Sequence, residues 1–138
     1  SIINWREGMK NIAIDTILFT VKNKEEEIAD VMLDLKEREY AIVYTDLYGH
    51  VTEPETGGRL RKKAIEKFLA TLGEIDIVAM PVNKTNTLPI KMNAAMVTYF
   101  MNEESYNTDG PIDGNLAKLH KAIEHLIGKS FGSYDFYQ

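Results

Sequence analysis

The chain has 138 residues, no cysteine and a formal net charge of −5 at pH 7. This length suits one domain that folds without disulfides or a structural metal, and the lack of cysteine excludes thiolate chemistry. The negative charge argues against general binding to nucleic acid or to anionic membranes. No apolar run reaches the length of a membrane span, so we expect a soluble, cytoplasmic single domain over residues 1–138.

The first half of the chain predicts two strands and an intervening helix. Asn11–Val21 is apolar on both faces, which is typical of a central strand covered on both sides. Lys24–Glu39 is predicted to be a helix, and Tyr40–Tyr48 is predicted to be a second strand because it is rich in β-branched and aromatic residues. Val51–Thr52 can instead begin a hairpin arm. The apolar residues with helical spacing in the predicted helix are Ile28, Val31, Met32 and Leu35.

The clearest helix-to-strand unit runs from Thr56 to Val82. Its helix is predicted to end at Gly73, because a glycine accepts the left-handed conformation that closes many helices. A buried strand over Ile75–Ala79 follows, and Pro81 ends it because proline cannot donate to a sheet ladder. The apolar face of the helix is formed by Leu60, Ala64, Phe68, Leu69 and Leu72.

The last third of the chain is predicted to contain one ambiguous element, a loop and a helix. Thr87–Met101 fits either a helix or a strand, and we favour a strand from Ala94 onward. Asn102–Asn115 is a loop by composition, and Leu116–Ile127 is a helix that ends at Gly128. The predicted class is α/β, with α+β as the alternative: a single-layer mixed sheet of about four to five strands packed by three helices.

A glycine pair gives the first candidate site. Gly57 and Gly58 precede the predicted helix, where exposed backbone N–H groups attract anions, and Arg59 and Arg61 add positive charge. The stretch over residues 57–86 resembles the cofactor-binding segment of GNAT acetyltransferases, although two adjacent glycines replace the spaced glycines of that family. The resemblance implies that the turn binds the pyrophosphate of acetyl-CoA or another phosphate-bearing cofactor. The alternative is that the glycines only cap a helix.

Three aspartates on predicted strands give the second candidate site. Asp15, Asp46 and Asp76 can converge on Mg²⁺ if their strands are neighbours. The phrase GEIDIVA, at residues 73–79, resembles the metal-ligand strand of PD-(D/E)xK nucleases, which implies that Asp76 binds the metal. Pro89 stands where that family places an acid before the next lysine. The alternative is that the aspartates accept hydrogen bonds from loop amides at strand ends.

The histidines give a third, weaker candidate. His50 lies in a polar loop with Glu53 and Glu55, where it can serve as a general base, bind a metal or simply be solvated. His120 and His125 are five residues apart on a predicted helix, so their side chains diverge and cannot form the usual metal-binding pair. We expect both of them at the surface.

The C-terminal tail over residues 129–138 is rich in aromatic residues, which is unusual for a disordered tail. We expect it to dock on its own domain or on a neighbouring subunit through Phe131, Tyr134, Phe136 and Tyr137. Because no complete catalytic constellation is present, we expect a small acidic non-catalytic binding or assembly module that acts through self-association or a protein partner. The alternatives are an acyltransferase-like enzyme with a cofactor at the Gly57–Arg61 turn and, third, a metal-dependent nuclease.

Overall fold

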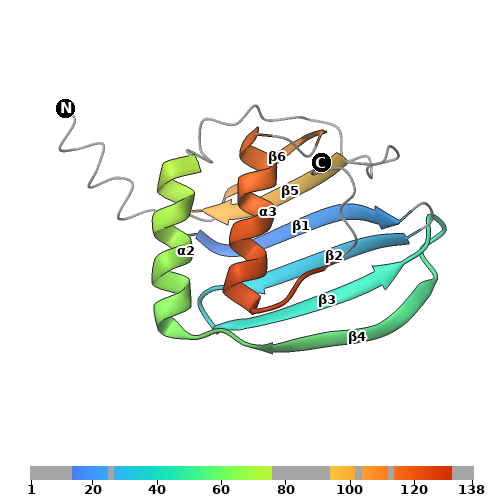
Figure 1. The fold of residues 1–138 in the computed structure, drawn as a ribbon, viewed down its shortest axis with the longest axis horizontal. Helices are drawn as coiled ribbons and strands as arrows, with labels where there is room; N and C mark the ends of the chain where they lie inside the picture. Colours follow the sequence, from blue (N-terminus) through green and yellow to red (C-terminus); the bar gives the residue numbers. More distant parts are fainter. Residues whose placement is uncertain (1–13, 25–26, 76–93, 102–103, 112–113, 132–138) are drawn as a thin grey trace.

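The computed structural model describes residues 14–24, 27–75, 94–101, 104–111 and 114–131. Within these ranges six strands form one sheet, and two helices pack on one of its faces (Figure 1). None of the helices in this part of the chain is long and apolar enough to span a membrane. The elements are β1 (Ile14–Lys24), β2 (Glu27–Asp34), β3 (Glu39–Thr45), β4 (Val51–Arg59), α2 (Lys62–Ile75), β5 (Ala94–Met101), β6 (Glu104–Pro111) and α3 (Gly114–Ile127).

The sheet has the order β4-β3-β2-β1-β5-β6, and each of these neighbouring pairs is antiparallel. The protein is therefore of the mixed α+β kind, and it is built from hairpins. The predicted mixed sheet of four to five strands with three helices is not confirmed, because the described residues contain six antiparallel strands in one sheet and two helices. The main reason is that the first predicted helix is a strand, which allows β1, β2 and β3 to follow one another directly.

Strand β2 replaces the helix predicted over Lys24–Glu39. Ala29, Val31 and Leu33 are all fully buried on one face, whereas the intervening Met32 is 52% exposed on the other. The segment satisfies two patterns, because Val31 and Leu35 belong both to the helical spacing and to an alternation of apolar residues. The alternation prevails because β1 offers a strand with a matching apolar face to pair with.

The core lies between this sheet face and the two helices. On β1, Phe19 is fully buried and pairs with Val31 of β2, while Ile17 pairs with Leu33. Burial of each such side chain contributes about 1.5–3 kcal/mol. The helices supply the covering layer, with Ile65, Phe68, Leu72 and Ile75 from α2 and Leu116, Leu119, Ile123 and Leu126 from α3.

The glycine pair belongs to β4 and does not form a turn that opens a helix. Gly57 pairs with Ala41 and Gly58 with Tyr40 of β3, so the alternative of a hairpin arm at Val51 is confirmed. A Cβ atom at Gly57 would lie 2.7 Å from the carbonyl oxygen of Tyr40, which explains the need for glycine in this strand. Helix α2 begins at Lys62, three residues after β4 ends.

Helix α2 also runs past its predicted end. It continues through Gly73 to Ile75, whose side chain is buried against the core and holds the last turn in place. Leu69, predicted to be on the apolar face, is 38% exposed, and Ile65 is buried instead. Ile75 therefore ends a helix rather than beginning a strand, and the rest of the predicted Ile75–Ala79 strand lies outside the described residues.

The C-terminal elements are largely as predicted. The strand from Ala94 is confirmed as β5, and the helix ending at Gly128 is confirmed as α3. The loop predicted over Asn102–Asn115 is wrong, because residues 104–111 form β6 and pair with β5 along its whole length. A polar composition is compatible with this strand because β6 lies at the edge of the sheet.

The chain turns back into the core after α3. Gly128 has a φ of 75°, and the N–H groups of Gly128 and Lys129 donate to the carbonyl oxygen of Glu124 at 2.9 and 3.2 Å. Phe131 then packs on its own domain with no exposed surface. His120 is also fully buried, so its predicted place at the surface is wrong, whereas His125 is exposed as predicted.

Candidate interaction surfaces

The turn between β3 and β4 is fixed by Asp46. Its Oδ1 accepts hydrogen bonds from the backbone N–H groups of Tyr48 and His50 at 2.8 and 2.9 Å, and its Oδ2 lies 3.1 Å from Nδ1 of His50. The backbone closes the turn as well, because the Asp46 N–H donates to the His50 carbonyl at 2.8 Å. Gly49 adopts a φ of 86°, which glycine reaches without steric cost.

The hydrogen bonds to its carboxylate lower the pKa of Asp46, with the His50 backbone N–H as the largest cause. Asp46 is therefore ionised at neutral pH and accepts these hydrogen bonds as a carboxylate. His50 is oriented by this contact, although its side chain is 78% exposed. No group of three or more Asp, Glu or His side chains in the described ranges is arranged to hold a metal. The turn is thus ordered by hydrogen bonds made within it.

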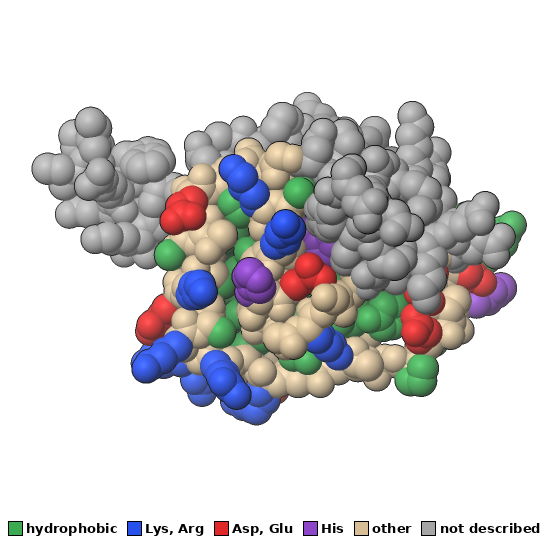
Figure 2. Space-filling view, in the orientation of Figure 1, with side chains coloured by type: hydrophobic (Ala, Val, Ile, Leu, Met, Phe, Trp, Pro, Cys, Tyr) green, Lys and Arg blue, Asp and Glu red, His purple; other side chains and the backbone are tan. Residues whose placement is uncertain are grey.

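This turn displays apolar side chains to solvent. Five large hydrophobic side chains stand out as exposed in the described residues, and three of them fall within five positions: Leu47 at 45%, Tyr48 at 85% and Val51 at 68%. We define residues 46–51 as the hairpin tip. Figure 1 places the tip at the end of the sheet away from α2, and Figure 2 shows hydrophobic and His side chains projecting at that end.

The base of the hairpin is anchored, and its outer edge is poorly suited to adding another strand. Thr52 donates to Oε2 of Glu27 at 2.7 Å, and Glu27 itself is almost fully buried. Beyond this contact, Pro54 lacks an N–H group, and the exposed Glu53 and Glu55 add negative charge along the edge. The pairing of β4 with β3 is also irregular at Tyr44. Contacts at this end are therefore expected from side chains of the tip.

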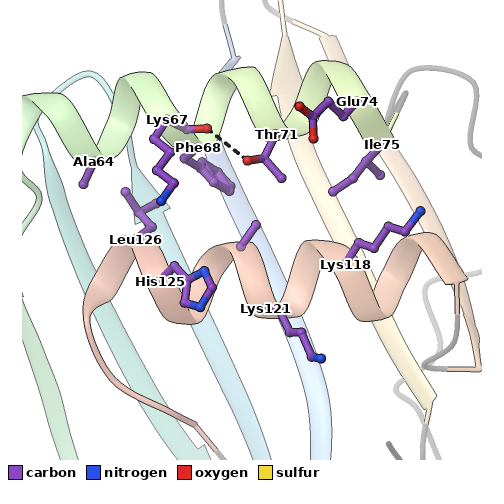
Figure 3. Close-up of a pocket in the computed structure, with 11 residues that line it drawn as sticks. Ala64, Lys67, Phe68, Thr71, Glu74, Ile75, Lys118, Lys121, His125 and Leu126 are labelled. Atoms are coloured by element: carbon purple, nitrogen blue, oxygen red, sulfur yellow. Dashed lines mark hydrogen bonds between the residues drawn. The ribbon is translucent and has the colours of Figure 1, made fainter.

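A second surface feature is the groove between α2 and α3, which has a volume of about 380 Å³ (Figure 3). Apolar side chains from both helices line it, including Phe68 and Leu126. Figure 3 shows Lys67 reaching from α2 toward α3, while Lys118 and Lys121 extend from α3. The remaining lining residues are Ala64, Thr71, Glu74, Ile75, Ala122 and His125. We call this feature the α2–α3 groove.

The helical layer is positively charged although the whole chain is acidic. Residues 59–75 and 114–131 contain eight Lys and Arg but three Glu, whereas the complete chain has 16 Lys and Arg against 21 Asp and Glu. Figure 2 shows Lys and Arg side chains over the helices and at the start of α2. Such an asymmetry attracts acidic groups to the helical face even in a protein of negative net charge.

The predicted cofactor site is not organised as a turn. Gly57 and Gly58 lie within β4, and Arg59, at the end of that strand, approaches Glu39 of β3 with Nη1 and Oε1 4.0 Å apart. Arg61 is exposed just before α2. The two arginines therefore flank the start of the helix, but the glycines do not present a loop there. Binding of a phosphate-bearing cofactor by these residues stays a prediction.

The predicted metal site is not assembled by the two of its aspartates that the structure describes. Asp15 lies at the start of β1, where its carbonyl accepts from the N–H of Leu35 at 2.8 Å, beside the β2–β3 turn. Asp46 follows Thr45, which pairs with Ile28 at the other end of β2. The two carboxylates are therefore at opposite ends of the sheet. Asp76 lies outside the described residues.

Of the predicted tail contacts, Phe131 docks on its own domain, and the others lie outside the described residues. These are Tyr134, Phe136 and Tyr137. Sequence reasoning missed the exposed Leu47 and Tyr48, which it included in a strand running to Tyr48. A turn signal was present, because Asp46 accepts from nearby amides and Gly49 supplies a positive φ. The α2–α3 groove had no comparable signal.

Comparison of the chain with known proteins returns no match, either to a protein-family model or to a curated protein sequence. Function is therefore inferred from the two surfaces described above. The hairpin tip exposes three large apolar side chains on a hydrogen-bonded turn, and the α2–α3 groove is concave and basic.

Proposed function

We propose that the chain is a non-catalytic binding module that contacts a protein surface through its hairpin tip. The observation that carries the proposal is the 85% exposure of Tyr48 on a turn whose backbone N–H groups donate to Asp46. Tyrosine is among the residues that most often dominate binding energy at protein interfaces. A large aromatic ring left in water by a fixed turn is therefore suited to enter a pocket of a binding partner.

The hydrogen bonds within the tip support this proposal energetically. Association loses free energy when flexible loops and side chains become ordered, so a loop ordered beforehand binds more tightly. At the tip, Asp46 accepts three hydrogen bonds from within the turn, and Thr52 ties the hairpin to the buried Glu27. Leu47 and Val51 flank Tyr48 and enlarge the apolar surface that a partner can cover.

Site-specific photocrosslinking tests the proposal in cells that express the chain. Tyr48 is replaced by the photoreactive analogue p-benzoylphenylalanine, and a matched variant carries the same analogue at Glu37. Glu37 is a suitable control because it is exposed in the β2–β3 turn, at the opposite end of the sheet. We expect a discrete crosslinked product from position 48 that position 37 does not give.

A second substitution makes the crosslink specific to the tip. Leu47→Ser removes neighbouring apolar surface without touching the buried core, since Leu47 is 45% exposed. In the position-48 background it should reduce the yield of the crosslinked product several-fold. Absence of any product at position 48, or equal products at positions 48 and 37, would argue that the tip is not the contact surface.

A further inference from the structure

The hairpin tip and the α2–α3 groove are complementary surfaces of the same chain. We infer that the hairpin tip of one copy docks into the α2–α3 groove of a second copy. This inference rests on the proposed function, because it uses the hairpin tip as the contact surface and names what receives it. The inference goes beyond the proposed function because it assigns a role to the basic α2–α3 groove.

The hairpin tip together with the start of β4 beyond it carries a charge opposite to that of the groove. The hairpin segment over residues 46–55 contains Asp46, Glu53 and Glu55 and has no Lys or Arg. The groove is lined by three lysines, and Glu74 is its single acidic lining residue. Opposite charges across an interface speed association and fix the orientation of the partners. The groove lysines are Lys67, Lys118 and Lys121.

The shapes and polarities also match. The groove volume of about 380 Å³ falls within the range of about 300–1,000 Å³ that is typical of sites receiving a small ligand, which suits entry of one or two side chains. Phe68 and Leu126 provide apolar surface against which Tyr48 and Leu47 can be buried. A lysine ammonium beside an entering tyrosine ring adds a favourable cation–π interaction.

A single copy does not fill its own groove with its own tip. The tip lies at the end of the sheet away from α2, and its position is fixed by the β3–β4 pairing (Figure 1). The contact is therefore intermolecular, and it joins two different surfaces. Such contacts either close into rings or continue as open chains. Because a contact made by a hairpin tip is small, we expect association that depends on protein concentration.

A complementation experiment tests the docking directly. The tip variant carries Leu47→Ser with Tyr48→Ser, and the groove variant carries Lys118→Glu with Lys121→Glu. All four side chains are outside the buried core, so both variants should keep the unfolding midpoint of the unmodified chain within a few degrees. Sedimentation equilibrium is then measured for each variant alone and for the equimolar mixture.

The unmodified chain should increase in average mass with concentration, and each variant alone should remain a monomer. The equimolar mixture should form a dimer with one copy of each variant, because the groove variant supplies an intact tip and the tip variant an intact groove. This dimer cannot grow, since its remaining tip and groove are both damaged. A charge-matched control, Lys62→Glu with Lys63→Glu, changes exposed lysines that do not line the groove and should associate like the unmodified chain.

The inference is overturned if the unmodified chain is a monomer at every concentration, or if mixing the two variants produces no dimer. An equal loss of association in the Lys62 and Lys63 control would also overturn it, because general charge rather than the groove would then be responsible. Failure here is distinguishable from failure of the proposed function. A photocrosslink from position 48 to a different protein would keep the tip as a binding surface while rejecting the second copy as its occupant.

Discussion

The imidazole of His120 lies against the ring of Phe131, with their centroids 4.4 Å apart. Both rings also contact Phe19 on β1, His120 in a stacked arrangement and Phe131 edge-on. Phe131 is therefore part of the core, and it holds residues 128–131 against the domain. Its backbone N–H also donates to Oε2 of Glu124 at 3.3 Å, which fixes the turn that brings the chain back.

Truncation of Phe131 should be among the most damaging single changes in the described residues. Phe131→Ala leaves a cavity beside Phe19 and His120, and such changes cost about 3–5 kcal/mol of unfolding free energy. Urea unfolding followed by circular dichroism measures this loss. Tyr48→Ala, at a side chain that is 85% exposed, is the control and should change stability by less than about 0.5 kcal/mol. Comparable losses of unfolding free energy from the two variants would contradict the burial of Phe131 and the exposure of Tyr48.

Burial of His120 should make the protein acid-sensitive. Burial lowers the pKa of His120 from 6.5 to about 3, and the hydrogen bond with the Phe131 backbone opposes this shift only in part. In the unfolded chain, His120 therefore binds a proton near pH 6.5, whereas in the folded chain its imidazole stays neutral at that pH. The contribution is fully present above pH 6.5 and is lost as pH falls toward 3, by about 1.4 kcal/mol per pH unit.

The pH dependence is checked by measuring unfolding free energy between pH 7 and 5 for the unmodified chain and for His120→Leu. Glu124 contributes the opposite sign, because burial raises its pKa and favours the folded state as this carboxyl takes up a proton. The difference between the two proteins isolates His120. We expect the unmodified chain to lose stability more steeply on acidification. Equal slopes for the two proteins would show that His120 is not buried in its neutral form.

The two glycines of β4 should respond differently to the same substitution. A Cβ at Gly57 meets the backbone oxygen of Tyr40 at 2.7 Å, and a backbone atom cannot easily move. A Cβ at Gly58 meets the Tyr40 ring at 3.0 Å, and a side chain can adjust. Gly57→Ala should therefore cost about 1–3 kcal/mol and Gly58→Ala distinctly less, as measured by thermal unfolding. Alanine is more favourable than glycine in a strand that has room for its Cβ atom. Stabilisation by Gly57→Ala would therefore contradict the close approach of Gly57 to Tyr40.

Removal of the Asp46 carboxylate should loosen the hairpin tip without unfolding the domain. Asp46→Ala deletes the acceptor of the Tyr48 and His50 N–H groups, so hydrogen exchange at these amides should accelerate at least several-fold. The photocrosslink from position 48 should weaken in parallel. Asp34→Ala is the control, because Asp34 accepts from Glu37 in the opposite turn and should leave the tip amides unchanged. Unchanged exchange in Asp46→Ala would show that this carboxylate does not order the turn.

The lowered pKa of Asp46 also predicts how the order of the hairpin tip changes with pH. Because the folded-state pKa lies below the ordinary value of 3.8, the ionised carboxylate favours the ordered turn above that value. The advantage is lost as pH falls through the folded-state pKa. Protection of the His50 amide should therefore persist at pH 4 and decline only at lower pH. A decline that begins well above pH 4 would show that the Asp46 carboxylate is not what orders the turn.

The elements that the sequence predicted well are those in which one pattern stands alone. Asn11–Val21 has no competing helical pattern, and Leu116–Ile127 has a single apolar face with a glycine stop, so β1 and α3 were predicted. Strand β2 was missed because Val31 and Leu35 fit both the helical spacing and the alternation of a strand. The choice between the periods depends on pairing with β1 and β3, which lie elsewhere in the sequence.

The candidate surfaces were harder to predict than the fold. The glycine pair was assigned to an anion-binding turn because nothing local shows that Gly57 lies against the backbone of Tyr40. Tyr48 was included in a strand because its aromatic ring favours β structure, although Asp46 and Gly49 mark a turn. The α2–α3 groove exists only after both helices pack on the sheet, so the sequence did not show that Lys67 and Lys118 line one groove.

Hydroxyl-radical footprinting of Tyr48 tests the central claim, that the hairpin tip is the binding surface, most directly. Tyr48 is 85% exposed and Met32, on the sheet face opposite the helices, is 52% exposed, so both should be oxidised quickly in dilute purified protein. In concentrated protein or in cells that express the chain, we predict strong protection of Tyr48 with little change at Met32. Protection of Met32 with Tyr48 still fully reactive would contradict the claim and would move the binding surface to the sheet face that carries Met32.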